Sequence, residues 1–346
     1  MRSIDELIRP CIKNLKPYSS ARDEYTGSEG IFLDANENPF NNPLNRYPDP
    51  RQRILKNRIS SLKGVNEESI FLGNGSDEAI DLIFRAFCEP AKENVISIDP
   101  TYGMYQVAAG TNNIEVKNVS LKPDFSLDTK AVLKAANSQT KIVWLCSPNN
   151  PTGNCLQFEK IKELLTKFNG IVVVDEAYID FAPGKSLISK LNEFPNLIIL
   201  QTFSKAWGVA GIRLGMAFAN KKIIDTLNKI KYPYNINSLT QQTAIEMIKT
   251  NSKNVTKWID ILLQEREKLS NELIKLPFIT KIYPSEANFL LVNCIKPKDI
   301  YSYLTQEKII VRDRSNVTLC EGCLRITVGT PDENKRLLIA LTNYNL

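Results

Sequence analysis

The sequence predicts an α/β protein in which helices cover a mostly parallel central sheet, with a smaller α+β domain built from both chain termini. Strand-like runs alternate with helix-period segments through the middle two-thirds of the chain. The runs are apolar and β-branched and end in polar residues, a pattern typical of strands that are buried on both faces. The clearest runs are Val95–Ile98, Lys141–Leu145, Ile171–Val174 and Leu197–Leu200.

The change of pattern after Tyr234 sets the predicted domain boundaries. A long helix from about Ser238 to Leu276 is followed by three short strands, Phe289–Val292, Ile309–Val311 and Leu324–Val328. We therefore assign residues 45–237 to a large domain and residues 238–346 to a small α+β domain. We expect residues 1–44 to pack with the small domain, because the loop from Asp34 to Pro39 is too polar for a core.

The composition indicates a cytoplasmic protein. A net charge of +6 comes without a concentrated Lys/Arg tract, so we expect no nucleic-acid partner. No uncharged apolar run reaches membrane-spanning length, so we expect no membrane partner. Seven scattered cysteines do not form a disulfide framework. We expect no metal site, since Cys320-x-x-Cys323 has no second pair and the chain contains no histidine.

The missing histidine means that a general acid or base working near neutral pH must be a perturbed Lys, Tyr, Asp, Glu or Cys. Lys205 is the leading candidate, because it follows a buried strand and precedes a glycine-bearing loop. Burial and a nearby cation such as Arg213 would lower the pKa of its amine and allow imine formation. Taken alone, a lysine that extends to water remains the simpler interpretation.

Asp175 ends the Ile171–Val174 strand, where a carboxylate is costly to bury without a cationic partner. A protonated pyridine nitrogen is such a partner, and pairing with it would keep a pyridoxal phosphate ring protonated as an electron sink. The pattern therefore predicts pyridoxal 5'-phosphate as cofactor, with Lys205 and Asp175 as catalytic residues. An N-cap or a structural ion pair remains open for Asp175.

A phosphate-binding turn is predicted where Gly75, Ser76 and Asp77 begin a helix. Ser76 is the expected cap, and the backbone amides there would face the phosphate. Because Asp77 and Glu78 have the same charge sign as phosphate, we assign charge compensation to Arg213. Hydroxyl donors come from Ser76 and from the strand-end segment, Thr202 and Ser204. An ordinary strand-to-helix turn is the alternative.

The ring of the cofactor has three predicted contacts. Asn150, in the proline-rich loop from Ser147 to Gly153, can donate to the phenolic oxygen. Tyr178, three residues after Asp175, can donate to the same oxygen and is counted with the catalytic residues. Tyr102 is a candidate to stack on the ring. Either tyrosine could equally serve core packing.

Together these segments closely resemble the fold-type I pyridoxal-phosphate enzymes, and within them the class II aminotransferases. The finer resemblance is to the histidinol-phosphate aminotransferase family and covers nearly the whole chain. The first set of motifs is Asn150-Pro151-Thr152-Gly153, Asp175-x-x-Tyr178, Ser204-Lys205 and Gly211-x-Arg213-x-Gly215; the finer set is Leu33–Pro39, Arg46–Pro50, Gly75–Glu78, Phe87–Pro90 and Gly322–Gly329.

The resemblance implies a homodimer with active sites at the subunit interface, in which Tyr47 reaches the cofactor phosphate of the neighbouring subunit. It implies exchange of an amino group between L-histidinol phosphate and 2-oxoglutarate, giving imidazole-acetol phosphate and L-glutamate. It also implies a cis peptide bond before Pro151.

The implied substrate-binding residues include Arg325, whose guanidinium can pair with either a phosphate or a carboxylate. Arg312 and Tyr18 resemble the additional phosphate contacts of the family, and Asn36 lies in a matching motif. An ion pair of Arg312 with Asp313 is the alternative for that residue.

Three other functions compete with this interpretation. Threonine-phosphate decarboxylase shares the fold, the cofactor and a phosphorylated substrate, and an aromatic-amino-acid aminotransferase is the next rival. A non-enzymatic regulator domain would need a DNA-binding module at the amino terminus, and the motifs begin near Asp34.

Overall fold

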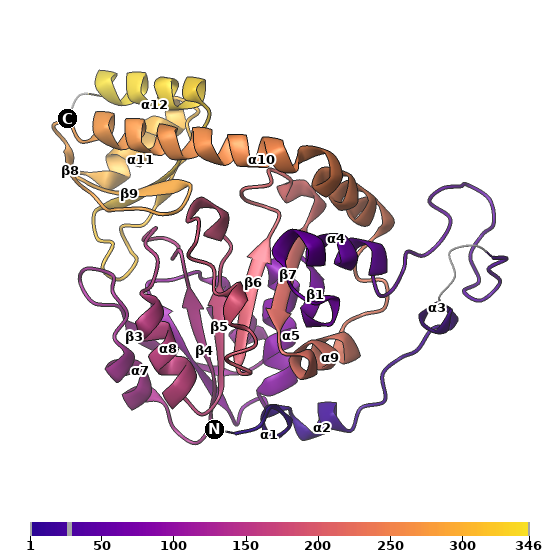
Figure 1. The fold of residues 1–346 in the computed structure, drawn as a ribbon. Helices are drawn as coiled ribbons and strands as arrows, with labels where there is room; N and C mark the ends of the chain where they lie inside the picture. The colour runs from indigo at the N-terminus through magenta and orange to yellow at the C-terminus, as the bar shows by residue number, and fades with distance from the viewer. Residues whose placement is uncertain (1, 26–29, 345–346) are drawn as a thin grey trace.

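The computed structural model of the protein describes residues 2–25 and 30–344, and it contains two sheets. A large seven-stranded sheet has the strand order β1-β7-β6-β5-β4-β2-β3, and a small four-stranded sheet has the order β10-β11-β9-β8. Figure 1 shows the small sheet and its helices above one end of the large sheet. The predicted α/β class with a second, smaller α+β layer is confirmed.

The four clearest apolar runs of the sequence all form strands of the large sheet, as predicted. Neighbouring strands from β3 to β6 run parallel, whereas β7 is antiparallel to both β6 and β1. Strands β1, β3 and β7 were not among the predicted strands. The bounds are β1 (Ile70–Asn74), β2 (Asn94–Asp99), β3 (Glu115–Ser120), β4 (Thr140–Cys146), β5 (Ile171–Asp175), β6 (Leu197–Thr202) and β7 (Leu214–Ala219).

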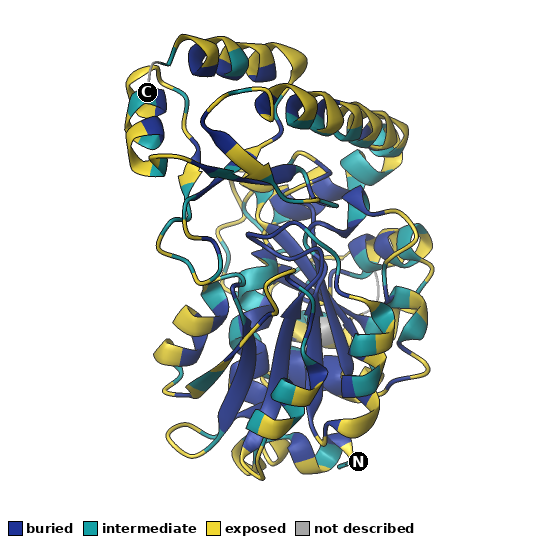
Figure 2. Cartoon of the chain, turned by 90° about the vertical axis from the view of Figure 1, so that its left-hand side faces the viewer, coloured by how far each residue is buried: buried dark blue, intermediate teal, exposed yellow. Residues whose placement is uncertain are grey.

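Both faces of the large sheet are covered, because its strands are apolar on both sides. In β5, Val172 and Val174 belong to one core cluster, and Ile171 and Val173 belong to the other. Figure 2 shows these strands buried between helices that expose their outer faces. One face is covered by α4 (Arg53–Lys63), α7 (Thr129–Ala135) and α8 (Phe158–Lys167), and the other by α5 (Gly75–Phe87), α6 (Met104–Thr111) and α9 (Lys221–Ile230).

The small layer is an antiparallel sheet packed against helices. Its longest helix, α10 (Ser238–Leu273), contacts both α4 of the large layer and the last helix of the small layer. The predicted strand over Ile309–Val311 is wrong, since only Arg312 and Asp313 pair with β11. Ile309 and Val311 pack in the small core while Ile310 is exposed, and this alternation produced the strand signal. The remaining elements are β8 (Ile279–Ile282), β9 (Phe289–Cys294), β10 (Arg312–Asp313), β11 (Cys323–Thr327), α11 (Pro297–Gln306) and α12 (Pro331–Asn343).

The first helices lie on the large layer, so the expected packing of the amino-terminal segment with the small domain is wrong for them. Ile4 and Leu7 are buried in the core cluster that α5 and α9 also form. Lys222 of α9 pairs with Asp5 at 2.6 Å. Figure 1 shows α1 (Ile4–Leu7) and α2 (Pro10–Lys13) at the foot of the large sheet, away from the small layer.

Residues 30–52, which we call the arm, contain no helix or strand and extend away from the rest of the molecule (Figure 1). The short helix α3 (Ala21–Glu24) lies before the arm. Within the described parts of the chain, no helix has the length and apolar character needed to span a membrane.

Candidate active site

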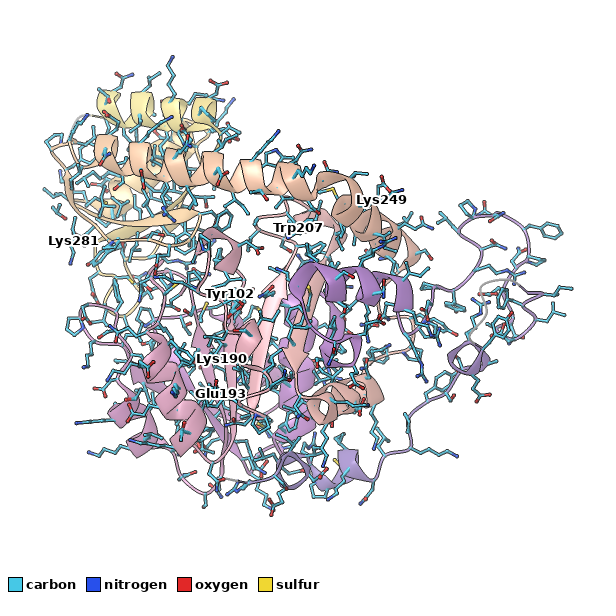
Figure 3. All side chains as sticks on the ribbon, viewed as in Figure 1. Tyr102, Lys190, Glu193, Trp207, Lys249 and Lys281 are labelled. Atoms are coloured by element: carbon cyan, nitrogen blue, oxygen red, sulfur yellow. The ribbon has the colours of Figure 1, made fainter. Side chains whose placement is uncertain are left out.

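A cavity of about 120 Å³ lies at the carboxyl ends of β4, β5 and β6, facing the small layer. This edge of a parallel sheet is where α/β proteins bind ligands. All the predicted cofactor-binding residues except Tyr47 line it, and Figure 3 labels one of them, Tyr102, at the end of the large sheet. The lining residues are Gly75, Ser76, Asp77, Tyr102, Cys146, Asn150, Asp175, Ala177, Tyr178, Thr202, Ser204, Lys205 and Arg213.

The Asp175 carboxylate lies at the bottom of the cavity and is 2% exposed. It accepts hydrogen bonds from the Tyr105 hydroxyl at 2.8 Å and from the Ala177 amide at 3.0 Å. Burial raises its pKa to about 6, although these two hydrogen bonds oppose the rise. Among the described residues no cation forms an ion pair with Asp175, so the site fits a ligand that brings a positive charge.

Lys205 follows β6 and lines the same cavity. Its ammonium nitrogen lies 5.5 Å from the centroid of the Tyr178 ring. Burial, together with the positive charges of Arg325 and Arg213, lowers the pKa of this amine, and the charge of Asp175 acts in the opposite direction. The arrangement favours the neutral amine that nucleophilic attack on a carbonyl requires.

A phosphate-sized anion fits where β1 meets α5. Gly75 has a φ of +73°, and a Cβ atom there would come within 2.8 Å of Arg213 Nη2. Gly215 lies across from it, where a Cβ atom would come within 2.1 Å of the Ser76 amide nitrogen. Thr202 and Ser204 add hydroxyls that are 3.0 Å apart. The glycines therefore let the backbone, hydroxyls and Arg213 converge on one anion.

The helix cap differs from the prediction, because α5 begins at Gly75 and not after Ser76. Asn74 is the residue before the first turn, and Ser76 lies inside that turn. Asp77 accepts from the Tyr102 hydroxyl at 3.2 Å and pairs with Arg213 at 3.4 Å. Glu78 accepts instead from Asn235 at 3.1 Å, and of these two acidic residues Asp77 is the one that lines the cavity.

The loop after β4 connects the cavity to the small layer. Arg325 on β11 donates from Nη1 to Asn150 Oδ1, and this contact orients the Asn150 side chain. No described residue accepts from the Asn150 amide group, which leaves it as a donor toward the cavity. The Asn150–Pro151 peptide bond is cis, as predicted.

Two arginines of the small layer carry unused donors beside this loop. The Nε atoms of Arg314 and Arg325 are buried and have no acceptor in the described parts of the chain. Burial, followed by the charges of Arg325 and Arg312, lowers the pKa of Arg314. Arg325 is near enough for its charge to act on Arg314, and two guanidiniums with unused buried donors fit an anionic ligand. Arg314 was not among the predicted site residues, although it lies two residues after the predicted Arg312.

The two predicted tyrosines differ in their surroundings. Tyr178 is buried, and its ring lies edge-on to Phe289 at 5.1 Å. Tyr102 lies edge-on to Tyr105 at 5.6 Å. Burial raises the pKa of both phenols, so each keeps its proton and can donate a hydrogen bond. Tyr105 itself was missed, and its position three residues after Tyr102 was the available signal.

Five predicted residues are not among the described residues that line this cavity, and one of them, Arg325, contacts the lining residue Asn150. Tyr47 and Asn36 lie together in the arm, around a separate hollow. Tyr18 is 73% exposed and lines another hollow near α9. Arg312 is exposed on β10, paired in register with Arg325, and it forms no ion pair with Asp313 or any other described residue.

Residues 32–341 match the model of the family described as aminotransferase class I and II. The chain belongs to this aminotransferase family. The aminotransferase is 56% identical to a histidinol-phosphate aminotransferase of Parabacteroides distasonis over the whole of both chains. Pyridoxal 5'-phosphate is its cofactor, which agrees with the unpaired carboxylate, the lysine and the anion-binding turn of the cavity.

Solved structures also match the aminotransferase. Histidinol-phosphate aminotransferase from Clostridium acetobutylicum is 26% identical with a TM-score of 0.80, covering 86% of this chain and 90% of that chain. L-Threonine-O-3-phosphate decarboxylase from Porphyromonas gingivalis is 24% identical with a TM-score of 0.73, covering 86% of this chain and 90% of that chain. The second likeness indicates the fold alone.

Proposed function

We propose that this aminotransferase moves the amino group of L-histidinol phosphate to 2-oxoglutarate, giving imidazole-acetol phosphate and L-glutamate in histidine biosynthesis. Relatives of that name match over the full chain at 56% identity. The structural observation that carries the proposal is the pair of arginines, Arg314 and Arg325, whose buried Nε donors have no acceptor among the described residues. Arg325 contacts Asn150, which lines the Lys205 cavity.

Both amino donors of this reaction carry an anion at the end distant from the reacting amine. A phosphomonoester and a carboxylate can each pair with a guanidinium fork. Arg325 is held against Asn150 at the edge of the cavity, so its free donors can bind either anion. Arg314 and the exposed Arg312 add positive charge for a phosphate dianion.

Bound pyridoxal phosphate supplies an electron sink for the pair released when the substrate Cα–H bond breaks. Asp175 would hold the pyridine nitrogen protonated, and Arg213 with Ser204 and Ser76 would hold the phosphate. Asn150 and Tyr178 would donate to the phenolic oxygen. The Lys205 amine, once displaced by substrate, would carry the proton between the substrate α-carbon and cofactor C4′.

We also propose a homodimer in the cytoplasm, with the large and small domains divided as 45–237 and 238–346. The arm exposes large apolar side chains that a second copy of the chain would cover. Tyr47 would reach the cofactor phosphate of the second subunit, and Asn36 would approach its substrate. These apolar residues are Ile31, Leu33, Phe40 and Leu44, each more than half exposed.

The experiment that tests the function compares substrates on the pyridoxal-phosphate-loaded enzyme. Glutamate formation from 2-oxoglutarate is measured with L-histidinol phosphate and with L-phenylalanine, and carbon dioxide release is measured with L-threonine phosphate. We expect kcat/KM for L-histidinol phosphate to exceed that for L-phenylalanine by about a hundredfold, because a phosphate dianion can pair with more than one arginine, whereas the carboxylate of phenylalanine carries a single charge. Faster release of carbon dioxide than of glutamate would overturn the proposal in favour of a decarboxylase.

A further inference from the structure

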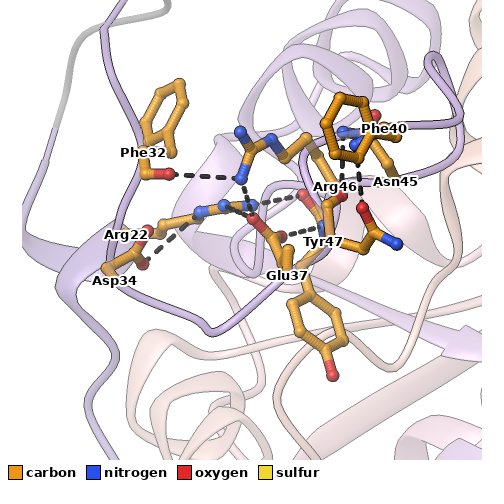
Figure 4. Close-up of polar contacts among 9 residues, drawn as sticks. Arg22, Phe32, Asp34, Glu37, Phe40, Asn45, Arg46 and Tyr47 are labelled. Carbon is orange, nitrogen blue, oxygen red and sulfur yellow. Dashed lines mark hydrogen bonds and ion pairs between the residues drawn. The ribbon is translucent and has the colours of Figure 1, made fainter.

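The carboxylate of Glu37, whose side chain is only 5% exposed, lies at the centre of the contacts that hold the arm together (Figure 4). Asp34 adds a longer ion pair with Arg22, at 3.5 Å. The Glu37 Oε2 atom accepts from Arg22 Nη2 at 2.6 Å and from Arg46 Nη1 at 2.8 Å. Its Oε1 atom accepts from the Tyr47 backbone amide at 2.6 Å. A single buried side chain therefore binds the residue before Tyr47, the backbone of Tyr47, and an arginine from the preceding helix.

The two arginines extend these contacts over the rest of the arm. Arg22 also donates to the Tyr47 carbonyl at 2.7 Å, and its guanidinium lies 4.9 Å above the Phe32 ring. Arg46 donates to the Phe32 carbonyl at 3.1 Å. The arm contains no helix or strand, so it lacks the regular backbone hydrogen bonds of those elements. Its backbone groups are instead held by these side-chain contacts.

The network keeps Glu37 ionised. Burial favours the neutral acid, but the hydrogen bonds from Arg46, the Tyr47 amide and Arg22 outweigh it and hold the pKa of Glu37 below its usual value. The charges therefore persist at neutral pH, inside a segment whose exposed side chains are largely apolar.

The Tyr47 side chain points away from this network. Its ring is 52% exposed and stacks on Tyr234, with the ring centroids 4.5 Å apart. The arm thus fixes the backbone of Tyr47 on both sides, at the amide and at the carbonyl, and leaves its phenol on the surface. This arrangement suits a side chain that must present its hydroxyl to another molecule.

We propose that Glu37 is a positioning residue that holds Tyr47 in place for the active site of the second subunit. The proposal rests on the homodimer of the proposed function. It adds that Glu37 acts across the interface, by fixing the arm of one subunit so that the cofactor of the other subunit is bound tightly.

The first test uses Glu37→Gln, which keeps the shape of the side chain and removes its charge. We expect the Kd for pyridoxal phosphate to rise about tenfold, since hydrogen bonds to charged groups are lost, while the mass of the dimer in light scattering stays unchanged. Glu272→Gln is the matched control, because Glu272 pairs with Lys275 on the exposed surface of α10. Loss of the dimer, or an unchanged Kd, would overturn the proposal.

The second test asks whether Glu37 works through Tyr47. Tyr47→Phe should also weaken pyridoxal phosphate binding, and adding Glu37→Gln to it should have little further effect. Independent, additive effects of the two substitutions on the Kd would show that Glu37 acts elsewhere.

The third test uses mixed dimers and the visible absorbance of cofactor bound at Lys205. In the first mixed dimer, one subunit carries Lys205→Ala and the other carries Glu37→Gln. The remaining Lys205 site then receives its arm from the Lys205→Ala subunit, in which Glu37 is unchanged, and we expect wild-type affinity. In the second mixed dimer, one subunit carries both substitutions and the other is wild type. The wild-type Lys205 site then receives its arm from the subunit with Glu37→Gln, and we expect about tenfold weaker binding. The opposite result would place Glu37 in its own active site. Cofactor affinity is measured without amino donor, so a wrong substrate assignment would leave these results unchanged.

Discussion

The Tyr105 hydroxyl donates a 2.8 Å hydrogen bond to Asp175 Oδ2 beneath the cavity. Tyr105 is 1% exposed, and its ring stacks on Trp144 with the ring centroids 5.0 Å apart. In a chain without histidine, this phenol is the side-chain donor that supports the buried carboxylate. Because the bond favours the ionised form of Asp175, it also favours the protonated pyridine that this carboxylate would face.

Tyr105→Phe removes that donor and should raise the pKa of Asp175 above about 6. The carboxylate would then lose its charge at a higher pH, so pyridoxal phosphate binding should weaken by about tenfold near neutral pH and more below it. Titration of cofactor binding between pH 5 and pH 8, at values spaced by about half a unit, checks this. Tyr303→Phe, which loses a hydrogen bond in the small layer, should give the wild-type profile.

Asp175→Asn should stabilise the cofactor-free protein at high pH. Folding raises the pKa of Asp175 from its ordinary value near 3.8 to about 6. The protonated side chain therefore contributes fully to the stability of the fold at pH values below about 3.8, and this contribution is lost as the pH rises through about 6. Above that range the variant should be more stable than the wild type by about 3 kcal/mol, and near pH 4 the difference should shrink. Urea unfolding at both pH values measures it. Equal stability at high pH would mean that Asp175 has a cationic partner before the cofactor binds.

Gly75→Ala should weaken cofactor binding more than it weakens the fold. Gly75 and Gly64 both have positive φ angles, of +73° and +68°, so alanine at either position costs about 1 kcal/mol in backbone strain. Only at Gly75 does the new Cβ press on Arg213, at 2.8 Å from Nη2. The Kd for pyridoxal phosphate should therefore rise in Gly75→Ala alone, while thermal unfolding of the two cofactor-free variants should be similar.

Arg325→Gln should lower kcat/KM for L-histidinol phosphate and for 2-oxoglutarate by about a hundredfold or more, because both substrates lose a charge-assisted pair. Steady-state kinetics with each substrate varied in turn measures this. Arg58→Gln, an exposed arginine of α4, is the control. A loss confined to one substrate would assign Arg325 to a single anion.

The cavity could be predicted in advance because its parts are local in sequence. Asp175, Lys205 and Asn150 each follow an apolar run, and parallel strands bring their carboxyl ends to one edge. Tyr105 could not be assigned in the same way, since its contact with Asp175 depends on how α6 packs on the sheet. Arg314 likewise depends on the small layer facing the loop that carries Asn150.

The packing of the amino-terminal region could not be predicted from local patterns in the sequence. Helices of four residues carry too short a pattern to say which layer Ile4 and Leu7 will join. Tyr47 and Asn36 lie outside the cavity of their own chain, so their proposed roles depend on a second copy. A sequence gives no direct signal for a contact that forms only between subunits.

The most direct test of the account is reduction of the pyridoxal-phosphate-loaded enzyme with sodium borohydride, followed by peptide mass spectrometry. Hydride addition turns an imine between the cofactor aldehyde and a lysine into a stable secondary amine, which marks the lysine. We predict that the label falls on Lys205, and that Lys205→Ala carries no label and forms no glutamate. A label on a different lysine, or glutamate formation by Lys205→Ala, would contradict the assignment.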